Sequence, residues 1–153
     1  MKTIIVQLLM SILGSLSFSV IFNVHGIKKL IPIAIGGLMN WSTYLIVFHL
    51  SDNRIMGFFF ATVVTALLAE IFARVVKAPV IVLLVPMLIP LIPGGDLYYT
   101  MQNMLYNRLD VFFQYGERVL KEAAAIAFGI LFVATFVQLL TRIGKYRKGE
   151  PHS

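Results

Sequence analysis

A series of long apolar runs separated by short polar turns constrains this chain more than any other feature. About 20 apolar helical residues cross the hydrocarbon core of a bilayer, so most of these runs are long enough for one crossing. We therefore predict an all-α fold, a polytopic membrane helix bundle of about five transmembrane helices that forms a single integral membrane domain over residues 1–153. The expected helices cover residues 4–22, 30–50, 54–76, 80–107 with a break near 93–95, and 119–142.

The composition supports a membrane protein and argues against several other classes. Hydrophobic residues make up 59% of the chain and charged residues 13%, whereas soluble domains carry roughly 25% charged residues. The net charge of +6 does not indicate nucleic-acid binding, because the basic residues gather at the ends of apolar runs. With no cysteine, three scattered histidines and no phosphate-binding loop, the sequence predicts no metal site, no cofactor and no enzyme activity.

The first apolar run has two interpretations. Ser11, Ser15 and Ser19 form a small-residue stripe at four-residue spacing, and such stripes let membrane helices approach closely. Alternatively, the charged start and the small-x-small sequence at 17–19 resemble a cleavable signal peptide. We favour a retained helix, because the apolar run continues beyond that sequence to Phe22.

Polar and small side chains interrupt the middle of the second run. Gly36 or Gly37, Asn40 and Tyr44 fall near one face at helical spacing, and Pro32 is expected in the first turn, where proline is tolerated. This face predicts either close helix packing with an interhelical hydrogen bond from Asn40 or the polar lining of a solute path.

Glu70 is an ionisable residue inside the third run, on or beside a face of small residues that includes Ala66 and Ala69. A charged group within a membrane span is costly and is by default a functional hypothesis, so Glu70 is a candidate for ion coupling. Arg74 follows one turn later, near the end of the run, and the two residues could instead form an ion pair that anchors the membrane interface. Both interpretations fit the sequence.

The segment from Val80 to Asn107 is interrupted by Pro86, Pro90 and Pro93, with a glycine pair directly after the last proline. Each proline lacks a backbone N–H and clashes with the carbonyl four residues earlier, so no regular helix continues through the segment. Broken backbone at membrane depth is tolerated only where protein buries it or where it lines a cavity. Transporters often place their binding sites at such interrupted spans. We therefore predict that the break is the functional centre.

Two geometries fit this segment. It could form a half-helix that stops at Pro93-Gly94-Gly95 and restarts over residues 96–107, or a single kinked span. In the first geometry Asp96 would be the N-cap of the second half, and the start of that helix would suit an anionic group such as a carboxylate. A proline-glycine turn at a membrane surface is the structural alternative.

The rest of the chain is more polar and suggests an orientation. Residues 108–122 carry dense mixed charge and predict a water-exposed loop or surface helix, while Ala125 and Gly129 form a small-xxx-small pair in the last run. The basic tail, residues 143–153, is expected to be unstructured. With five crossings, eight basic residues fall on one side and five on the other, which favours an outside N-terminus and a cytoplasmic C-terminus. The eight are Lys28, Lys29, Arg74, Lys77, Arg142, Lys145, Arg147 and Lys148, and the five are Lys2, Arg54, Arg108, Arg118 and Lys121.

The order of these features is similar to that of a known family. Phe22-Asn23-Val24 closes the first helix, a glycine pair lies in the second, Glu70 lies late in the third, and Lys77-Ala78-Pro79 follows. The most specific part is Pro90-Leu91-Ile92-Pro93-Gly94-Gly95 with Tyr98. Together these residues resemble the threonine/serine exporter family, specifically its short YjjB-like half, from roughly Phe18 to Arg142.

This resemblance implies a secondary transporter in the cell (plasma) membrane that exports small hydrophilic solutes. The solutes would be threonine/serine-type amino acids or a small dicarboxylate such as succinate. The family unit has a short and a long half, so a larger membrane subunit is implied as the partner of this chain. The sequence is also compatible with a homo-oligomer of this chain. The candidates for solute binding or gating are Pro90, Pro93, Gly94, Gly95, Asp96, Tyr98 and Asn40, and the candidate for ion coupling is Glu70.

A non-transporting membrane scaffold that stabilises a partner membrane protein is the alternative function. Its support is that helix packing alone would explain every small-residue stripe in the sequence.

Overall fold

The computed structural model describes residues 2–147, and this part of the chain is entirely helical. Four of its helices are long and apolar enough to cross a membrane, and the bent pair α4–α5 would make a fifth crossing. The predicted all-α membrane bundle is therefore confirmed. The elements are α1 (Lys2–Ile21), α2 (Ile27–Ser51), α3 (Arg54–Val76), α4 (Val80–Leu88), the 3₁₀ turn η1 (Ile89–Leu91), α5 (Gly94–Leu105) and α6 (Leu109–Arg147).

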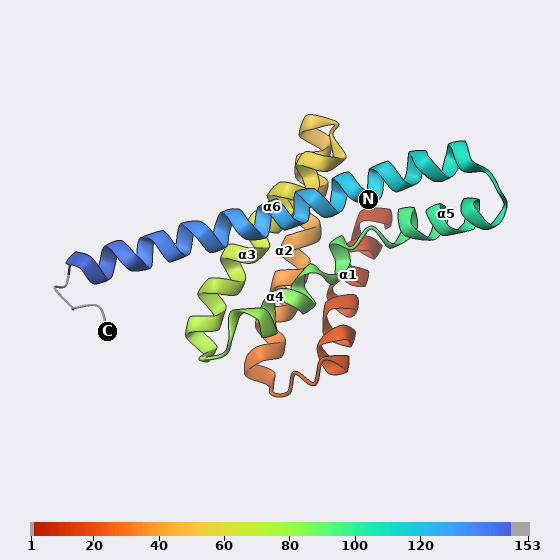
Figure 1. Ribbon diagram of the computed structural model, residues 1–153. Coiled ribbons are helices and arrows are strands. Elements are labelled where there is room, and N and C mark those ends of the chain that lie inside the picture. Colours follow the sequence, from red (N-terminus) through yellow and green to blue (C-terminus); the bar gives the residue numbers. More distant parts are fainter. Residues whose placement is uncertain (1, 148–153) are drawn as a thin grey trace.

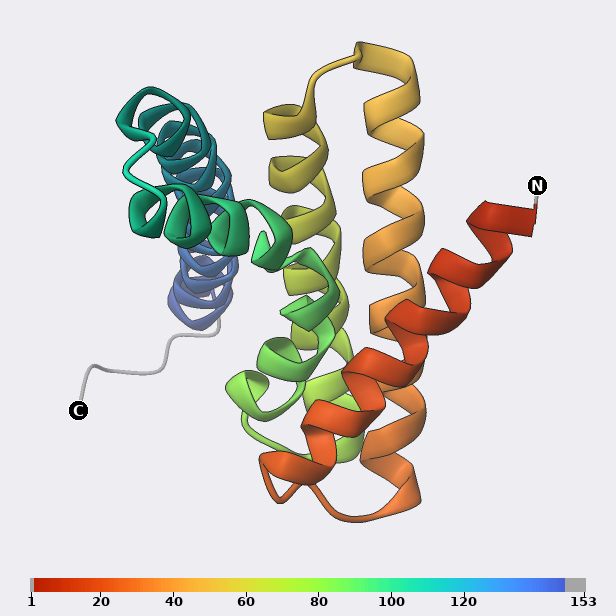
Figure 2. The same ribbon diagram turned by 90° about the vertical axis from the view of Figure 1, so that its right-hand side faces the viewer.

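Helices α2 and α3 form the centre of the bundle, and α1 packs against α2 (Figure 1). Helix α4 contacts both α2 and α3, so the first half of the broken segment lies inside the bundle. Helix α6 crosses α3 obliquely and extends beyond the bundle on both sides, with α5 lying along its first part (Figure 2). The α5–α6 hairpin therefore leaves the bundle to one side.

Residues in the left-handed conformation end four of the helices. Asn23, Asp52, Lys77 and Asn107 have φ values of 58°, 48°, 52° and 54°, a region that Asn and Asp tolerate better than most side chains. Helix α3 then starts with a side-chain cap, since Oδ1 of Asn53 accepts a hydrogen bond from the backbone N–H of Ile55 at 2.9 Å. These local residues explain why the connections are short and where each helix stops.

Small residues let the helices approach closely, as the stripes predicted. Ser15 and Ser19 are fully buried, and a Cβ atom added at Gly37 would collide with the Ser15 hydroxyl, so α1 and α2 meet at this pair. A Cβ atom at Gly129 would lie 2.8 Å from Cβ of Thr62, where α6 crosses α3. The interfaces therefore depend on these small residues.

Three local expectations were wrong. Helix α2 begins at Ile27 rather than near residue 30, so Pro32 lies in the second turn instead of the first. The last helix was expected to begin near residue 119, but α6 begins at Leu109 and is one continuous helix, so the mixed-charge segment 108–122 takes the surface-helix form of the two that were expected. Most of its charged side chains, such as Glu117, are exposed, whereas Glu122 lies on the face of the helix that is buried. Helix α6 also continues into the expected tail as far as Arg147, and residues 148–153 lie outside the described residues.

Candidate functional site

The Pro-Gly-Gly segment is a true break between two helices. Helix α4 gives way to the 3₁₀ turn η1, and α5 restarts at Gly94 at an angle of 60° to the first half. Pro93 is the N-cap of α5, with no hydrogen bond from a side chain. The expected N-cap role for Asp96 is therefore wrong, since Asp96 lies in the first turn of the helix and its carboxylate bonds elsewhere. A Cβ atom added at Gly94 or Gly95 would meet nothing within 4 Å.

Asn40 supports the break from the neighbouring helix. In the 3₁₀ turn each N–H bonds to the carbonyl three residues back, and the donor for the carbonyl of Met87 would be Pro90, which has no N–H. The side-chain amide of Asn40 donates to this carbonyl oxygen at 2.7 Å, and both residues are fully buried. The structure thus contains the interhelical hydrogen bond that the packing interpretation of Asn40 expected.

Asp96 forms an ion pair with the first residue of α3. Its Oδ2 atom lies 3.1 Å from Nη2 of Arg54, without the geometry of a hydrogen bond, and its side chain is only 12% exposed. Because Arg54 directly follows the α2–α3 turn, this contact places the break toward that end of the bundle.

The same guanidinium nitrogen also contacts a carboxylate from α6. Oε1 of Glu122 lies 2.9 Å from Nη2 of Arg54, and the Glu122 side chain is 3% exposed. Its other oxygen, Oε2, is buried and has no hydrogen-bond partner among the described residues. The hydroxyl of Tyr44 from α2 lies beside Arg54, and its ring packs over Gly57, where a Cβ atom would approach it to 2.9 Å. Four helices therefore meet at one guanidinium.

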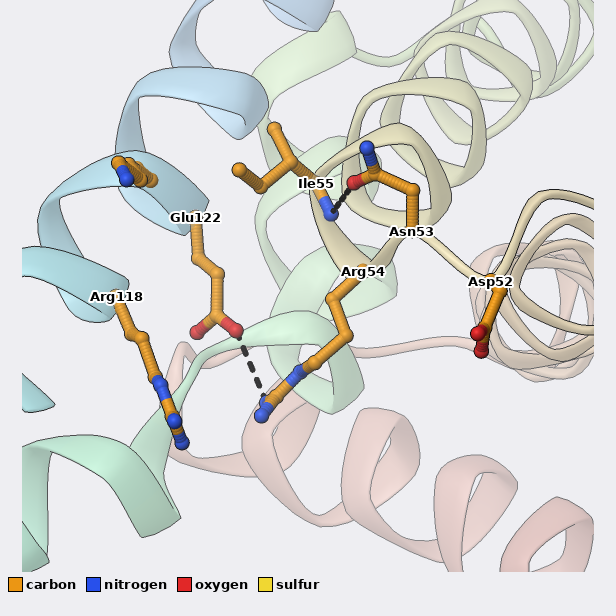
Figure 3. Close-up of a pocket in the computed structure, with 7 residues that line it drawn as sticks. Asp52, Asn53, Arg54, Ile55, Arg118 and Glu122 are labelled. Carbon is orange, nitrogen blue, oxygen red and sulfur yellow. Dashed lines mark hydrogen bonds and ion pairs between the residues drawn. The ribbon is translucent and has the colours of Figure 1, made fainter.

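We call Arg54, Asp96 and Glu122 the Arg54 cluster. A pocket of about 420 Å³ lies beside it and opens to the outside between the α2–α3 turn and α6. Figure 3 shows the Arg54 and Glu122 side chains pointing toward each other, with the Arg118 side chain next to Glu122. The residues that line the pocket are Asp52, Asn53, Arg54, Ile55, Arg118, Lys121 and Glu122. Charged side chains of both signs thus surround a space large enough for a small polar solute.

The structure separates most of the residues that the sequence analysis selected. Asn40 lies inside the bundle under α4, and Tyr98 is 62% exposed on the outer part of α5. Glu70 is half-buried and pairs with Arg74 at 3.7 Å, one turn along the same helix. Of the candidate residues, Asp96 alone belongs to the Arg54 cluster.

Two residues of the cluster, Arg54 and Glu122, were missed by the sequence analysis. A signal for Glu122 was present, because it is three and seven residues before Ala125 and Gly129 and so shares their helix face. All three are buried. Arg54 carries no comparable signal, since a basic residue at a helix start usually indicates the membrane surface.

Comparison with known proteins identifies the family to which this chain belongs. A family model described as Threonine/Serine exporter, ThrE, matches residues 7–136. The chain belongs to the threonine/serine exporter family. No curated protein and no solved structure shows a significant match to it.

Membership of an exporter family makes the chain a transport protein rather than an enzyme, and its helices make it a multi-pass membrane protein. The part of this exporter chain that matches the family contains α2, α3, the whole break and the three residues of the Arg54 cluster. The resemblance predicted from the Pro-x-x-Pro-Gly-Gly segment is therefore confirmed at the level of the family.

Proposed function

We propose that this chain is the short subunit of a secondary transporter that exports small hydrophilic solutes, either threonine/serine-type amino acids or small dicarboxylates such as succinate. The observation that carries the proposal is the family match over residues 7–136. The broken α4–α5 pair supports it, because interrupted helices at charged pockets are typical of solute sites in secondary transporters.

The charged groups of the Arg54 cluster and of the pocket beside it fit a solute with a carboxylate. Asp96 is held close to Arg54, and the pocket beside them also contains Arg118 and Lys121. Lys121 pairs with Glu117, whereas the Arg118 guanidinium lies 5.4 Å from the ring centre of Tyr115. A solute carboxylate entering this pocket would meet guanidinium groups, which bind carboxylates well.

The proposal assigns roles to the remaining candidate residues. The segment from Pro90 to Gly95 acts as a gate, since its 60° bend depends on prolines that cannot complete a helix. Tyr98, exposed beyond the break, contacts solute or partner, and Asn40 holds the end of α4 in place. Glu70 serves ion coupling near the other end of α3.

The proposed transporter works in the cell (plasma) membrane with an outside N-terminus, a cytoplasmic C-terminus and a larger membrane subunit of the same family as partner. The distribution of basic residues supports this orientation. Large apolar side chains are exposed on α5 and on the first part of α6, where they need lipid or a partner to cover them, for example Met101, Leu105 and Phe113.

Solute efflux tests this function. Cells that express the chain with its partner should export threonine, serine or succinate faster than cells that lack the chain. Asp96→Asn should reduce the efflux rate, whereas Asp110→Asn, which changes an exposed carboxylate in the first turn of α6, should not. Efflux that is the same with and without the chain would contradict transport.

A membrane scaffold is the second candidate function, because the buried small residues Ser15, Gly37 and Gly129 are all explained by packing. A scaffold predicts that loss of the chain lowers the amount of partner protein in the membrane. It also predicts that Asp96→Asn leaves the efflux rate per partner molecule unchanged.

A further inference from the structure

The Arg54 cluster contains more buried negative charge than positive charge. Asp96 and Glu122 both contact Nη2 of Arg54, at 3.1 Å and 2.9 Å, so the two contacting carboxylate oxygens lie within about 6 Å of each other. One guanidinium therefore faces two carboxylates whose side chains are 12% and 3% exposed. Burial and a like charge nearby both disfavour the ionised form of a carboxylate.

Two buried carboxylate oxygens in the cluster have no hydrogen-bond partner among the described residues, namely Oδ2 of Asp96, which lies 3.1 Å from Nη2 of Arg54 without hydrogen-bond geometry, and Oε2 of Glu122. Oε2 of Glu122 is buried and accepts no hydrogen bond from any described residue, although Oε1 of the same group bonds to Arg54. Buried polar atoms are nearly always paired, and an unpaired one asks for an explanation such as a bound ion. A proton is the smallest cation that would neutralise the excess charge, and it would convert the Glu122 oxygen from an acceptor without a donor into a hydroxyl that can donate a hydrogen bond.

Within residues 2–147, the structure shows an ion pair between Glu122 and one cation, Arg54. Tyr44 comes from α2, Arg54 from α3 and Asp96 from α5. Arg118 and Lys121 come from α6 itself, and Asp52 lies across the pocket. Among the described residues only Arg54 forms an ion pair with Glu122, since the ammonium group of Lys121 pairs with Glu117.

We infer that Glu122 takes up and releases one proton and that the Arg54 cluster is a proton-coupling site of the transporter, separate from Glu70. The coupling role rests on the proposed function, whereas proton binding does not. Water in the pocket beside Arg54 delivers the proton to a Glu122 oxygen, giving a neutral carboxylic acid, and accepts it again on release. Protonation leaves Arg54 paired with Asp96 alone, so it changes the contact between α6 and the broken helix.

Infrared difference spectroscopy on the purified full-length chain tests proton binding directly. Protonated carboxylic acids have a carbonyl stretching band that carboxylates lack. We expect one such band to titrate at a higher pH than the range near about 4 where exposed carboxyl groups titrate. Glu122→Gln should abolish this band. Asp110→Asn, which changes an exposed carboxylate in the first turn of the same helix, should leave it unchanged.

The partners of Glu122 give two further variants with opposite expected shifts. Asp96→Asn removes the like charge and leaves one carboxylate for one guanidinium, so the midpoint of the band should move to lower pH. Arg54→Gln removes the cation, so the midpoint should move to higher pH and the band should grow as a second carboxyl group takes up a proton. A second probe, helix content by circular dichroism, identifies variants that do not fold.

Several results would overturn the inference. They are a band that survives in folded Glu122→Gln, a midpoint that is unchanged in Asp96→Asn, or the absence of any titrating band in the wild type. The infrared titration needs no solute. A failure to export would therefore contradict the proposed function but would leave the result of this titration unchanged. For the coupling role, export driven by an imposed pH gradient should be lost in Glu122→Gln and retained in Asp110→Asn. Gradient-driven export by Glu122→Gln would overturn that role.

Discussion

The hydrogen bond from Asn40 to the carbonyl of Met87 gives the sharpest prediction about the break. The bond measures 2.7 Å, and both residues are 0% exposed, so water cannot replace Asn40 when the amide is removed. Asn40→Ala would leave the Met87 carbonyl without a donor, because the residue that would supply one in a 3₁₀ turn is Pro90.

The expected loss follows from three contributions. A buried carbonyl left unpaired costs about 1–3 kcal/mol, whereas side-chain hydrogen bonds inside membrane proteins average about 0.6 kcal/mol and reach about 1.7 kcal/mol. Part of the loss is offset, because Oδ1 of Asn40 is buried without a partner and disappears in the same variant. We therefore expect Asn40→Ala to lower the free energy of unfolding by about 1–1.5 kcal/mol, roughly a tenfold change in the unfolding equilibrium constant.

A double-mutant cycle identifies the cause. Pro90→Ala restores a backbone N–H that can bond to the Met87 carbonyl, so Asn40→Ala should cost less in the Pro90→Ala background than in the wild type. Pro93→Ala is the matched control, because its N–H would lie too far along the chain to reach that carbonyl in a helix or 3₁₀ turn. In the Pro93→Ala background, Asn40→Ala should lower the free energy of unfolding by as much as it does in the wild type.

The assay is equilibrium unfolding of the purified chain in mixed micelles, followed by helix content. Independent mutations add within about 0.3–0.5 kcal/mol, so the coupling with Pro90→Ala must exceed that range. Equal costs of Asn40→Ala in all three backgrounds would refute the reasoning. An effect of Asn40→Ala below about 0.3 kcal/mol in the wild type would also refute it.

Three other predictions concern stability and use the same unfolding assay. Gly129→Ala should lower the free energy of unfolding by about 1–3 kcal/mol, because the new Cβ would lie 2.8 Å from Cβ of the buried Thr62. The control Gly14→Ala, whose new Cβ would meet nothing within 4 Å, should be neutral or stabilising. Equal effects of the two variants would contradict close packing of α6 on α3. Asn53→Ala should lower the free energy of unfolding by about 1 kcal/mol, because it removes the N-cap of α3. Asn53→Asp should retain most of the stability, because aspartate is also a good N-cap. Glu70→Gln should change the stability by less than about 0.5 kcal/mol, since its ion pair is long and largely exposed, and a larger change would reveal another partner.

Local features of the sequence predicted the membrane-spanning helices and the break in the fourth span, although α6 begins at Leu109 rather than near residue 119. Hydrophobic length identifies a membrane helix almost independently of its neighbours, because the bilayer has a fixed thickness. The serine stripe of α1 and the alanine face of α3 were predicted as packing surfaces and are buried. The break falls at Pro90 and Pro93, since the missing N–H is a property of the residue itself, whereas Pro86 lies inside α4.

The same local view misplaced Asp96 and missed its partners. At the start of a helix, aspartate is a common N-cap, but here Pro93 holds that position and the Asp96 carboxylate reaches Arg54. In residues 108–122 the dense charge concealed one buried position, Glu122, because a helix separates neighbouring residues onto different faces.

The sequence by itself determined the membrane helices, the small-residue faces and the place where the fourth span breaks, because each depends on residues close together in the chain. Only the tertiary structure decided that Arg54, Asp96 and Glu122 share one guanidinium nitrogen. Their meeting depends on the 60° bend at the break and on the oblique path of α6 across α3. Those angles come from packing among helices, which no local pattern encodes.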